Sequence, residues 1–204
     1  MQNQGKEPDM SLIDLSLPIE EGMPVYPGDI QTSVRRLDDP KIIEAGWLAH
    51  NITMSLHAAT HVESPAHSVP GGKMLSEYPL ETFIGEATTI KQEDIGRYQV
   101  NTPILLVYSG YAQWWGKEKY FSPPPFTTEQ AEWIGESGIK IFGNDTISVG
   151  DVKIHQIIQE KNILIIESMC NLKQLLYQKA KLTLFPLKIL NKEASPVRVV
   201  AEIL

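Results

Sequence analysis

The order of apolar segments in the second half of the chain most constrains its fold. Apolar runs at 104–109, 139–142 and 163–167 alternate with two helical patterns at 128–136 and 151–161. The first helical pattern begins with a capping-box spacing at Thr127 and Gln130. A strand–helix–strand–helix–strand order predicts two successive βαβ units with parallel strands.

The rest of the chain predicts further strands around these units. Alternating apolar runs favour an antiparallel or barrel-like layer and lie at 12–17, 48–57, 82–90, 182–189 and 197–203. Residues 1–10 are polar without a period, which predicts a flexible tail before a single domain at 11–204. The Pro-rich segments 18–46 and 110–127 predict long loops, and such loops commonly shape a binding site or a subunit contact. We therefore expect a mixed α/β domain with few helices.

Charge and composition exclude several classes of partner. The 204 residues carry a formal net charge of -7, which disfavours nucleic acid and anionic membranes. No apolar run approaches the roughly 20 residues that span a bilayer. The single cysteine, Cys170, excludes an intrachain disulfide and is typical of a reducing cytoplasm. We expect a cytoplasmic protein that acts on a small molecule.

Three of the five histidines lie within the segment HAATHVESPAH, together with a glutamate. If this segment is extended, His57, His61 and Glu63 leave the backbone on one face, while Ile52 and the other even-numbered apolar residues face a core. A helix would also align the first two histidines, but Pro65 disfavours its continuation. Two imidazoles and a carboxylate on one face are the smallest tripod that holds a divalent metal with open positions.

A second pair of candidate ligands follows about 100 residues later. Glu167 ends the apolar run 163–166, where an unpaired buried carboxylate would need a compensating cation. His155 lies on the preceding helical pattern, so that both side chains can reach one end of the sheet. A core histidine and a strand-end glutamate are also common without any metal, so this pair alone leaves both interpretations open.

Four segments together resemble one family of enzymes. HAATHVESPAH resembles the motif H-x-G-T-H-x-D-x-P-x-H of the cyclase-like metal hydrolases, which include the bacterial kynurenine formamidases of tryptophan catabolism. MPVYPGD, GNDTIS and FPLKILNKEASPVRVV resemble the family's P-V-W-P-G-D, G-x-D-T-x-S and L-P-L-K…D-A-S-P-V-R segments. The matches occur in the family's order and cover the chain from about Leu12 to Leu204.

The resemblance implies a swivelling β/β/α fold with a two-metal centre and an assembly of two or four subunits. The first metal would be held by His57, His61 and Glu63, and Glu63 would bridge to a second metal completed by His155 and Glu167. The implied cofactor is Zn²⁺, two per subunit, or Mn²⁺. His67 would be the general acid and base. The implied assembly is a homodimer or homotetramer.

Three residues depart from the family's pattern. Glu63 replaces an aspartate and is one methylene longer, so that a bridge between metals requires a shift of around an ångström. Ala59 replaces a glycine, which is acceptable if the backbone there has a negative φ. Tyr26 replaces the tryptophan that contacts the aromatic substrate in formamidases, and it remains the candidate substrate-binding residue.

The resemblance and the residues together predict a metal-dependent amidohydrolase. The leading hypothesis is hydrolysis of N-formylkynurenine by metal-activated water, with His67 moving the protons. A second hypothesis keeps the metal centre but takes a cyclic amide, lactone or ester. A third is a metal-binding homologue without turnover, because Glu63 disrupts the bridge. Asp145 is expected to fix a loop or to hydrogen-bond a ligand histidine.

Overall fold

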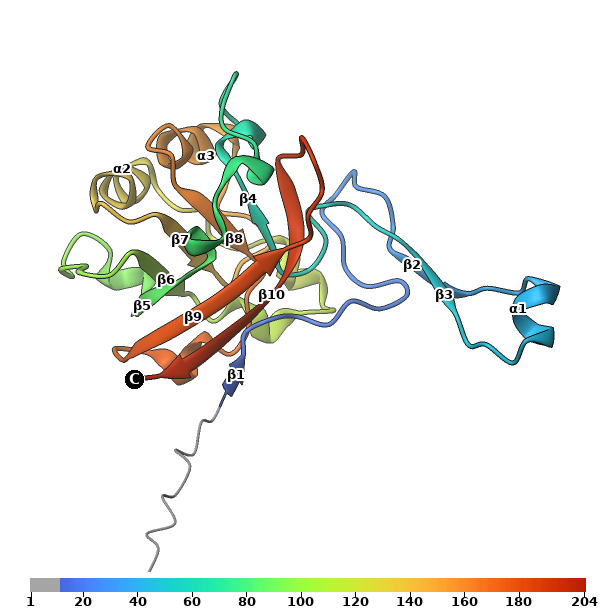
Figure 1. Ribbon diagram of the computed structural model, residues 1–204. Helices are drawn as coiled ribbons and strands as arrows, with labels where there is room; N and C mark the ends of the chain where they lie inside the picture. The colour runs from blue at the N-terminus through green and yellow to red at the C-terminus, as the bar shows by residue number, and fades with distance from the viewer. Residues whose placement is uncertain (1–11) are drawn as a thin grey trace, which may run out of the picture.

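The computed structural model describes residues 12–204, so the predicted tail at 1–10 lies outside the described residues. Eight strands form one sheet in the order β1-β10-β4-β8-β7-β6-β5-β9. Because β9 pairs with both β5 and β10, seven of these strands close into a barrel, and β1 extends it as an additional strand on β10. Figure 1 shows this barrel with α2 and α3 on one side and a separate projection on the other.

The predicted βαβ units are present and form the parallel part of the barrel. They consist of β6 (Ile104–Tyr108), α2 (Thr128–Glu136), β7 (Ile141–Asn144), α3 (Val152–Gln159) and β8 (Leu164–Glu167). The capping box at the start of α2 is also present, with Gln130 N–H donating to the Thr127 hydroxyl. β5 (Ile84–Lys91) adds a fourth parallel strand beside β6.

Antiparallel strands complete the barrel. They are β1 (Leu12–Asp14), β4 (His61–Glu63), β9 (Lys179–Pro186) and β10 (Ala194–Ile203). Together with the parallel strands they give the mixed α/β domain with barrel-like strands and few helices that the sequence predicts. Among residues 12–204, no helix is both long and apolar enough to cross a membrane.

Alternating side chains divide the apolar core between the two faces of the barrel wall. Leu106 and Ile166 pack in one cluster with residues of β9 and β10, inside the barrel. Leu105 and Ile165 pack in a second cluster with α2 and α3, outside it. Each parallel strand is therefore buried on both faces, as a strand of a βαβ layer must be.

A hairpin projects from the barrel and was not predicted as an element. It consists of β2 (Ser33–Arg36), α1 (Pro40–Glu44) and β3 (His50–Thr53), and we call residues 33–53 the arm. Figure 1 shows the arm extending away from the barrel, with α1 at its far end. The strand predicted at 48–57 is thus shorter than expected, since β3 ends at Thr53.

Candidate metal centre

The period of two in β4 and β8 places three polar side chains on the outer face of the barrel. Val62 of β4 packs inside, so its neighbours His61 and Glu63 point outward toward α3. In the antiparallel pairing His61 lies opposite Glu167, and Glu63 lies opposite Ile165, which packs against the helices. The register of a single strand pair therefore brings together three of the predicted ligands. All three are buried.

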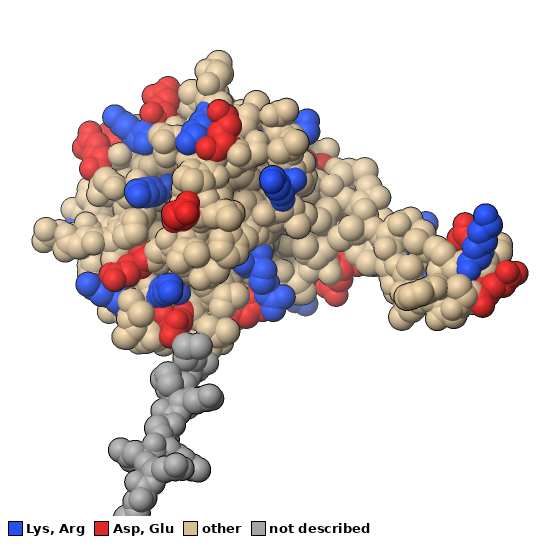
Figure 2. Space-filling view, in the orientation of Figure 1, with Lys and Arg blue, Asp and Glu red and all other residues tan. Residues whose placement is uncertain are grey.

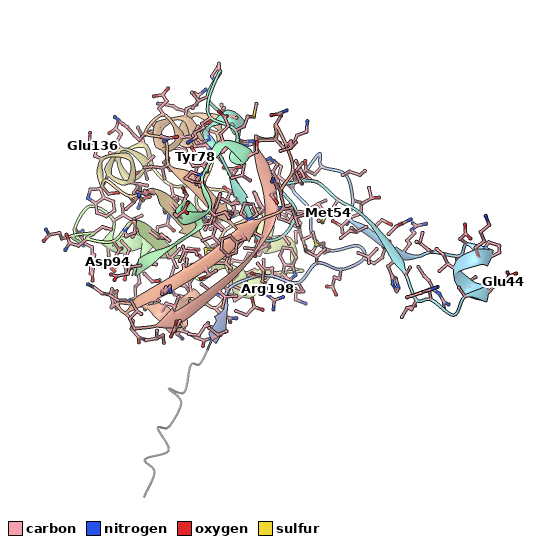
Figure 3. All side chains as sticks on the ribbon, viewed as in Figure 1. Glu44, Met54, Tyr78, Asp94, Glu136 and Arg198 are labelled. Carbon is pink, nitrogen blue, oxygen red and sulfur yellow. The ribbon has the colours of Figure 1, made fainter. Side chains whose placement is uncertain are left out.

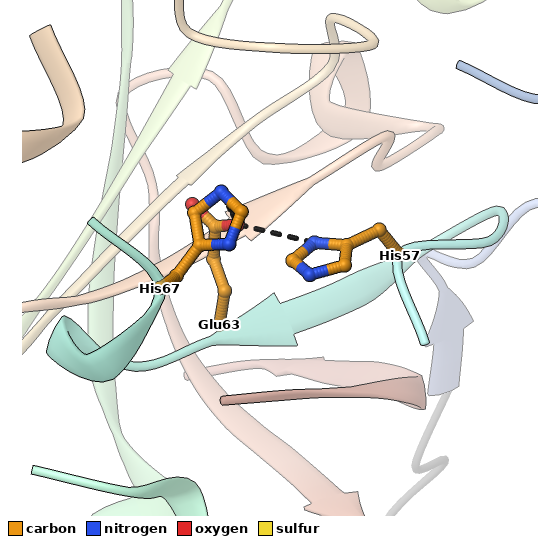
Figure 4. Close-up of side chains that lie close together, drawn as sticks. All are labelled: His57, Glu63 and His67. Atoms are coloured by element: carbon orange, nitrogen blue, oxygen red, sulfur yellow. Dashed lines mark ion pairs between the residues drawn. The ribbon is translucent and has the colours of Figure 1, made fainter. Parts of the chain in front are cut away.

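The other predicted site residues approach this face from outside. His155 of α3 has its Nε2 3.3 Å from Glu63 Oε1 and 3.5 Å from Glu167 Oε1. His57 Nδ1 lies 3.3 Å from Glu63 Oε2, and His67 Nε2 lies 3.4 Å from the same oxygen. Figure 4 shows both rings close to the Glu63 carboxylate. The structure thus brings all six predicted side chains into one cluster.

Backbone carbonyls fix the orientation of two of the imidazoles. His61 Nδ1 lies 3.0 Å from Ala59 O, and His155 Nδ1 lies 2.9 Å from Asp151 O. Since a carbonyl only accepts, each Nδ1 carries a proton, and Nε2 is the ring nitrogen that faces the carboxylates. This is the arrangement in which metal-binding histidines are commonly held.

The chemistry of the cluster fits a cation. Within the described residues, Nε2 of His61 and both carboxylate oxygens of Glu63 are buried without a hydrogen-bond partner. Burial lowers the pKa of His155, but the adjacent carboxylates of Glu167 and Glu63 outweigh it and raise that pKa to about 11. Burial alone would raise the pKa of Glu63, whereas the imidazoles of His155 and His57, each 3.3 Å from one of its oxygens, hold it well below its usual range. Two buried carboxylates therefore attract positive charge to this point, which a divalent cation would supply.

Two groups of three side chains have ligand atoms within 4.8 Å of one another. They are His57, Glu63 and His67, and His61, Glu63 and Glu167. Glu63 belongs to both groups, which is the position that the family resemblance gives to a bridging carboxylate. The groups differ from the resemblance in two respects, since His67 accompanies His57 in place of His61, and His61 accompanies Glu167 in place of His155.

Two local expectations from the sequence are wrong. Ile52 does not face a core, because it lies in the exposed strand β3 and is 51% exposed. The segment from His57 to His61 is not extended, because the chain turns at residues 55–60 before β4 begins. Ala59 in this turn has a φ of +51°, which is the left-handed region and not the negative φ that a side chain there favours. The turn places the His57 ring beside the Glu63 carboxylate. Of the three residues expected on one face of an extended strand, only His61 and Glu63 lie there.

A buried hydrogen-bond network fixes this turn against the end of β8. Thr60 Oγ1 accepts from Leu17 N–H at 2.8 Å and donates to the carbonyl of Ser168 at 2.5 Å. The Tyr120 hydroxyl donates to Ser168 Oγ at 2.9 Å. On the other side of the centre, Val149 N–H donates to Glu167 Oε1 at 2.6 Å. Thr60 therefore has a structural role.

Asp145 fixes a loop, as one of its two predicted roles requires. Its carboxylate accepts from Ser109 N–H at 2.8 Å, from Ser109 Oγ at 2.6 Å and from Gly110 N–H at 2.8 Å. These bonds hold the start of the 110–127 segment, in which Tyr120 is fully buried. The segment thus packs on the barrel of the same chain, and its Tyr120 hydroxyl contacts Ser168, the residue that follows Glu167.

The six clustered site residues line a cavity of about 340 Å³. Tyr26 and Asp29, which precede the arm, also line it, as do Ser148 and Val152, the first residue of α3. Sequence reasoning identified Tyr26 but missed Asp29, although Asp29 ends the MPVYPGD segment. The candidate substrate-binding residue therefore lies at the cavity that contains the predicted ligands.

A second hollow adjoins this cavity and is mostly apolar. The two share five lining residues, among them Tyr26 and Ile147. Phe121, Pro123 and Pro125 of the predicted 110–127 loop line the remainder. The loop thus forms one wall of a binding groove, which is one of the two roles that its length predicts.

Barrel and cluster together define a class of protein: a closed mixed barrel that carries histidine and glutamate side chains suited to a divalent cation. Residues 13–151 match the model of the Cyclase family, described as putative cyclase, and the chain belongs to this family. The uncharacterized protein MJ0783 of Methanocaldococcus jannaschii is 32% identical over 86% of this chain and 91% of its own. A kynurenine formamidase of Geobacillus thermodenitrificans is 28% identical over 91% of this chain and 94% of its own.

Solved structures share the fold. Isatin hydrolase A from Ralstonia solanacearum superimposes with a TM-score of 0.81 at 21% identity, covering 96% of this chain and 93% of its own. A potential metal-dependent hydrolase with cyclase activity superimposes with a TM-score of 0.76 at 21% identity, covering 95% and 98%. These likenesses confirm the predicted barrel-containing α/β architecture.

Proposed function

We propose that this protein is a metal-dependent hydrolase of a small aryl amide. The observation that carries the proposal is the convergence of three imidazoles and two buried carboxylates, with the Glu63 oxygens unpartnered within residues 12–204. Relatives that are kynurenine formamidases cover more than nine-tenths of the chain, which supports N-formylkynurenine as the first substrate to test.

The metal ligands in this proposal are those that the family resemblance implies. His57, His61 and Glu63 would hold one cation, and Glu63, His155 and Glu167 would hold a second. Zn²⁺ is the proposed cation and Mn²⁺ the alternative, since imidazole with carboxylate suits both. When bound, such a cation lowers the pKa of water to about 7 and polarises a carbonyl oxygen.

The proposed general acid and base is His67. Its side chain is about one-third exposed at the cavity, so that it can contact both substrate and solvent. Burial lowers its pKa below the usual value for histidine, which leaves the ring neutral and able to accept a proton at pH 7. In this scheme His67 accepts a proton from the attacking water and then donates it to the leaving nitrogen.

The apolar hollow supports an aromatic substrate. A ring beyond the scissile amide would lie against Phe121 and Pro123, while Tyr26 would stack at the junction with the cavity. The same groove would accept the fused ring of a cyclic amide. The fold shared with isatin hydrolases therefore favours a second candidate function, hydrolysis of a cyclic amide such as isatin, with lactones and other esters as further candidates.

Metal analysis combined with substrate tests checks this proposal. Two equivalents of metal with hydrolysis of N-formylkynurenine support a formamidase, and hydrolysis of isatin or a lactone alone supports the second candidate. Metal without turnover of any of these supports a metal-binding homologue.

A pair of variants separates the roles of the histidines. His67→Ala should retain both metals and lose most turnover, whereas His61→Ala should lose metal as well. Loss of metal from His67→Ala would make His67 a ligand, as its distance from Glu63 permits. Parental turnover in His67→Ala would refute its role as acid and base.

A further inference from the structure

One buried amide outside the cluster of site residues is bonded to the residue that follows His67. Gln159, the last residue of α3, is 1% exposed, and its Oε1 accepts from the Ser68 hydroxyl at 2.6 Å. This distance is typical of an O–H···O bond and short for an N–H···O bond, so the oxygen of the amide faces Ser68. Charged side chains, by contrast, are interspersed with both signs over the face of the barrel in Figure 2 and give that face no patch of one sign.

A second glutamine of α3 binds the same residue through its backbone. Gln156 Nε2 donates to the carbonyl of Ser68 at 2.9 Å. Residues three positions apart share a face of a helix, so both glutamines reach Ser68 from one side, and we call these two bonds the Ser68 clamp. Further along the same segment, the Tyr78 hydroxyl donates at 2.5 Å to Asn162 Oδ1, just after α3, and Figure 3 shows Tyr78 beside this helix. The segment after His67 is thus bonded to α3 and its end at more than one point.

Core packing does not explain a glutamine at position 159. Its Nε2 is buried without a hydrogen-bond partner among residues 12–204. A buried polar atom without a partner destabilises the folded state, whereas an apolar side chain of similar size would leave no such atom. The bond to Ser68 is therefore the feature that distinguishes this glutamine from a leucine.

The imidazole of His67 has less support than those of His61 and His155. Each of those two rings has its Nδ1 within hydrogen-bond distance of a backbone carbonyl. Within the described residues, no such bond orients the ring of His67, whose Nε2 lies 3.4 Å from Glu63 Oε2. The position of this ring therefore depends on the backbone of the short turn that ends at His67 and leads directly into Ser68.

The helix that holds Ser68 also carries a predicted metal ligand. His155 directly precedes Gln156, and the centroid of its ring lies 5.4 Å from that of His67. Both rings contact Glu63, with Nε2 of His155 3.3 Å from Oε1 and Nε2 of His67 3.4 Å from Oε2. A shift of the turn relative to α3 would therefore move His67 away from the ligands that surround Glu63.

We propose that Gln159 is a positioning residue, which holds His67 beside the cluster through Ser68, with Gln156 as the second point of attachment. The proposal rests on the role of His67 as general acid and base. Neither glutamine lines the cavity, whereas Ser68 does, so the glutamines act on the position of the turn and not on the substrate. A misplacement near 1 Å commonly costs about a hundredfold in turnover.

Gln159→Leu tests the proposal, because leucine has a similar volume and cannot accept the bond. Metal content and melting temperature should stay close to parental, since leucine also removes an unpaired buried donor. For a substrate that the parent hydrolyses, kcat should fall about tenfold to a hundredfold while KM changes by less than about twofold. Ser68→Ala should lower kcat likewise. The double variant should be no slower than the slower single variant, because both changes remove the same bond.

A matched control makes the same substitution at an exposed glutamine. The side chain of Gln174 makes no hydrogen bond within residues 12–204, so Gln174→Leu should leave kcat parental. A parental kcat in Gln159→Leu would overturn the proposal. A double variant in which the losses from Gln159→Leu and Ser68→Ala multiply would also overturn it, because the two residues would then act independently.

The position of His67 can also be measured without any substrate. Diethyl pyrocarbonate modifies accessible imidazoles, and mass spectrometry of peptides gives the rate at each histidine. His67 is about one-third exposed, so release of the turn in Gln159→Leu should make it react several times faster, while the exposed His50 of the arm should react at the parental rate. Equal rates at His67 in variant and parent would overturn the proposal. Faster reaction at His67 in a protein that hydrolyses none of the candidate substrates would support the Ser68 clamp and count against the proposed function alone.

Discussion

The catalytic position proposed for His67 depends on a glycine five residues later. A Cβ placed on Gly72 would lie 2.6 Å from both C and O of Pro65 and 2.8 Å from N of Ala66. All three contacts are backbone atoms of the short turn η1 (Pro65–His67), so no flexible side chain can move aside. Ordinary contact begins at 3.4 Å, and Gly72→Ala must therefore displace this turn by about 0.8 Å.

We expect this displacement to lower kcat by about tenfold to a hundredfold, since a misplacement near 1 Å commonly costs a hundredfold. The overpacking should also lower the free energy of unfolding by about 1–3 kcal/mol. Metal content should be retained, because residue 72 contacts no predicted ligand. The assay is steady-state hydrolysis of the substrate that the parent turns over, with metal content measured on the same sample.

A variant at a second glycine distinguishes displacement of His67 from a general loss of protein stability. Gly96 has a φ of +85° with open space around its Cβ, so Gly96→Ala should cost about 1 kcal/mol through backbone strain alone. It follows the β5 strand and is not in either cavity lining, so kcat should remain parental. Equal kcat values for Gly72→Ala and the parent would refute the dependence of His67 on this contact.

Three further measurements test other parts of the structure. Chelation should lower the melting temperature by roughly 5–10 °C, since a cation at 100 times its dissociation constant contributes about 2.7 kcal/mol; an unchanged melting curve would exclude bound metal. Asp145→Ala should lower the free energy of unfolding by about 2–4 kcal/mol in urea, because Ser109 and Gly110 lose their acceptor; a loss below about 0.5 kcal/mol would contradict this. Burial raises the pKa of Cys170 to about 11, so its alkylation should speed up about tenfold per pH unit from pH 8 to 10, and a plateau below pH 9 would contradict that pKa.

The residues of the two βαβ units could be placed from the sequence because their strands are buried on both faces. Long apolar runs then leave few alternatives to a buried strand. The parallel connection of these strands brings Glu167 close to the helix that carries His155. The alternation in β4 likewise predicts that His61 and Glu63 share a face, as the register with Glu167 shows. These parts follow from periodicity and connection rules alone.

The turn before β4 and the arm could not be predicted for opposite reasons. The turn needs a left-handed residue, and the sequence has Ala59 there, which gives no local signal for that conformation. The arm buries no residue, so the alternation at 48–57 predicts a strand with one buried face, whereas β3 is exposed throughout. In the turn, the buried hydrogen bonds of Thr60 to Leu17 and Ser168 decide the backbone.

The pairing of β4 has a consequence for when the centre can form during biosynthesis. Its two neighbours in the barrel are β8 and β10, and β10 places Ala194 opposite Glu63 and Pro196 opposite His61. A nascent chain that has not yet released residues 194–203 has every histidine and glutamate of the cluster but lacks one of the strands that hold them. Metal loading should accordingly wait until residues 194–203 have left the ribosome, and a truncation before Ala194 should abolish it without removing a single ligand.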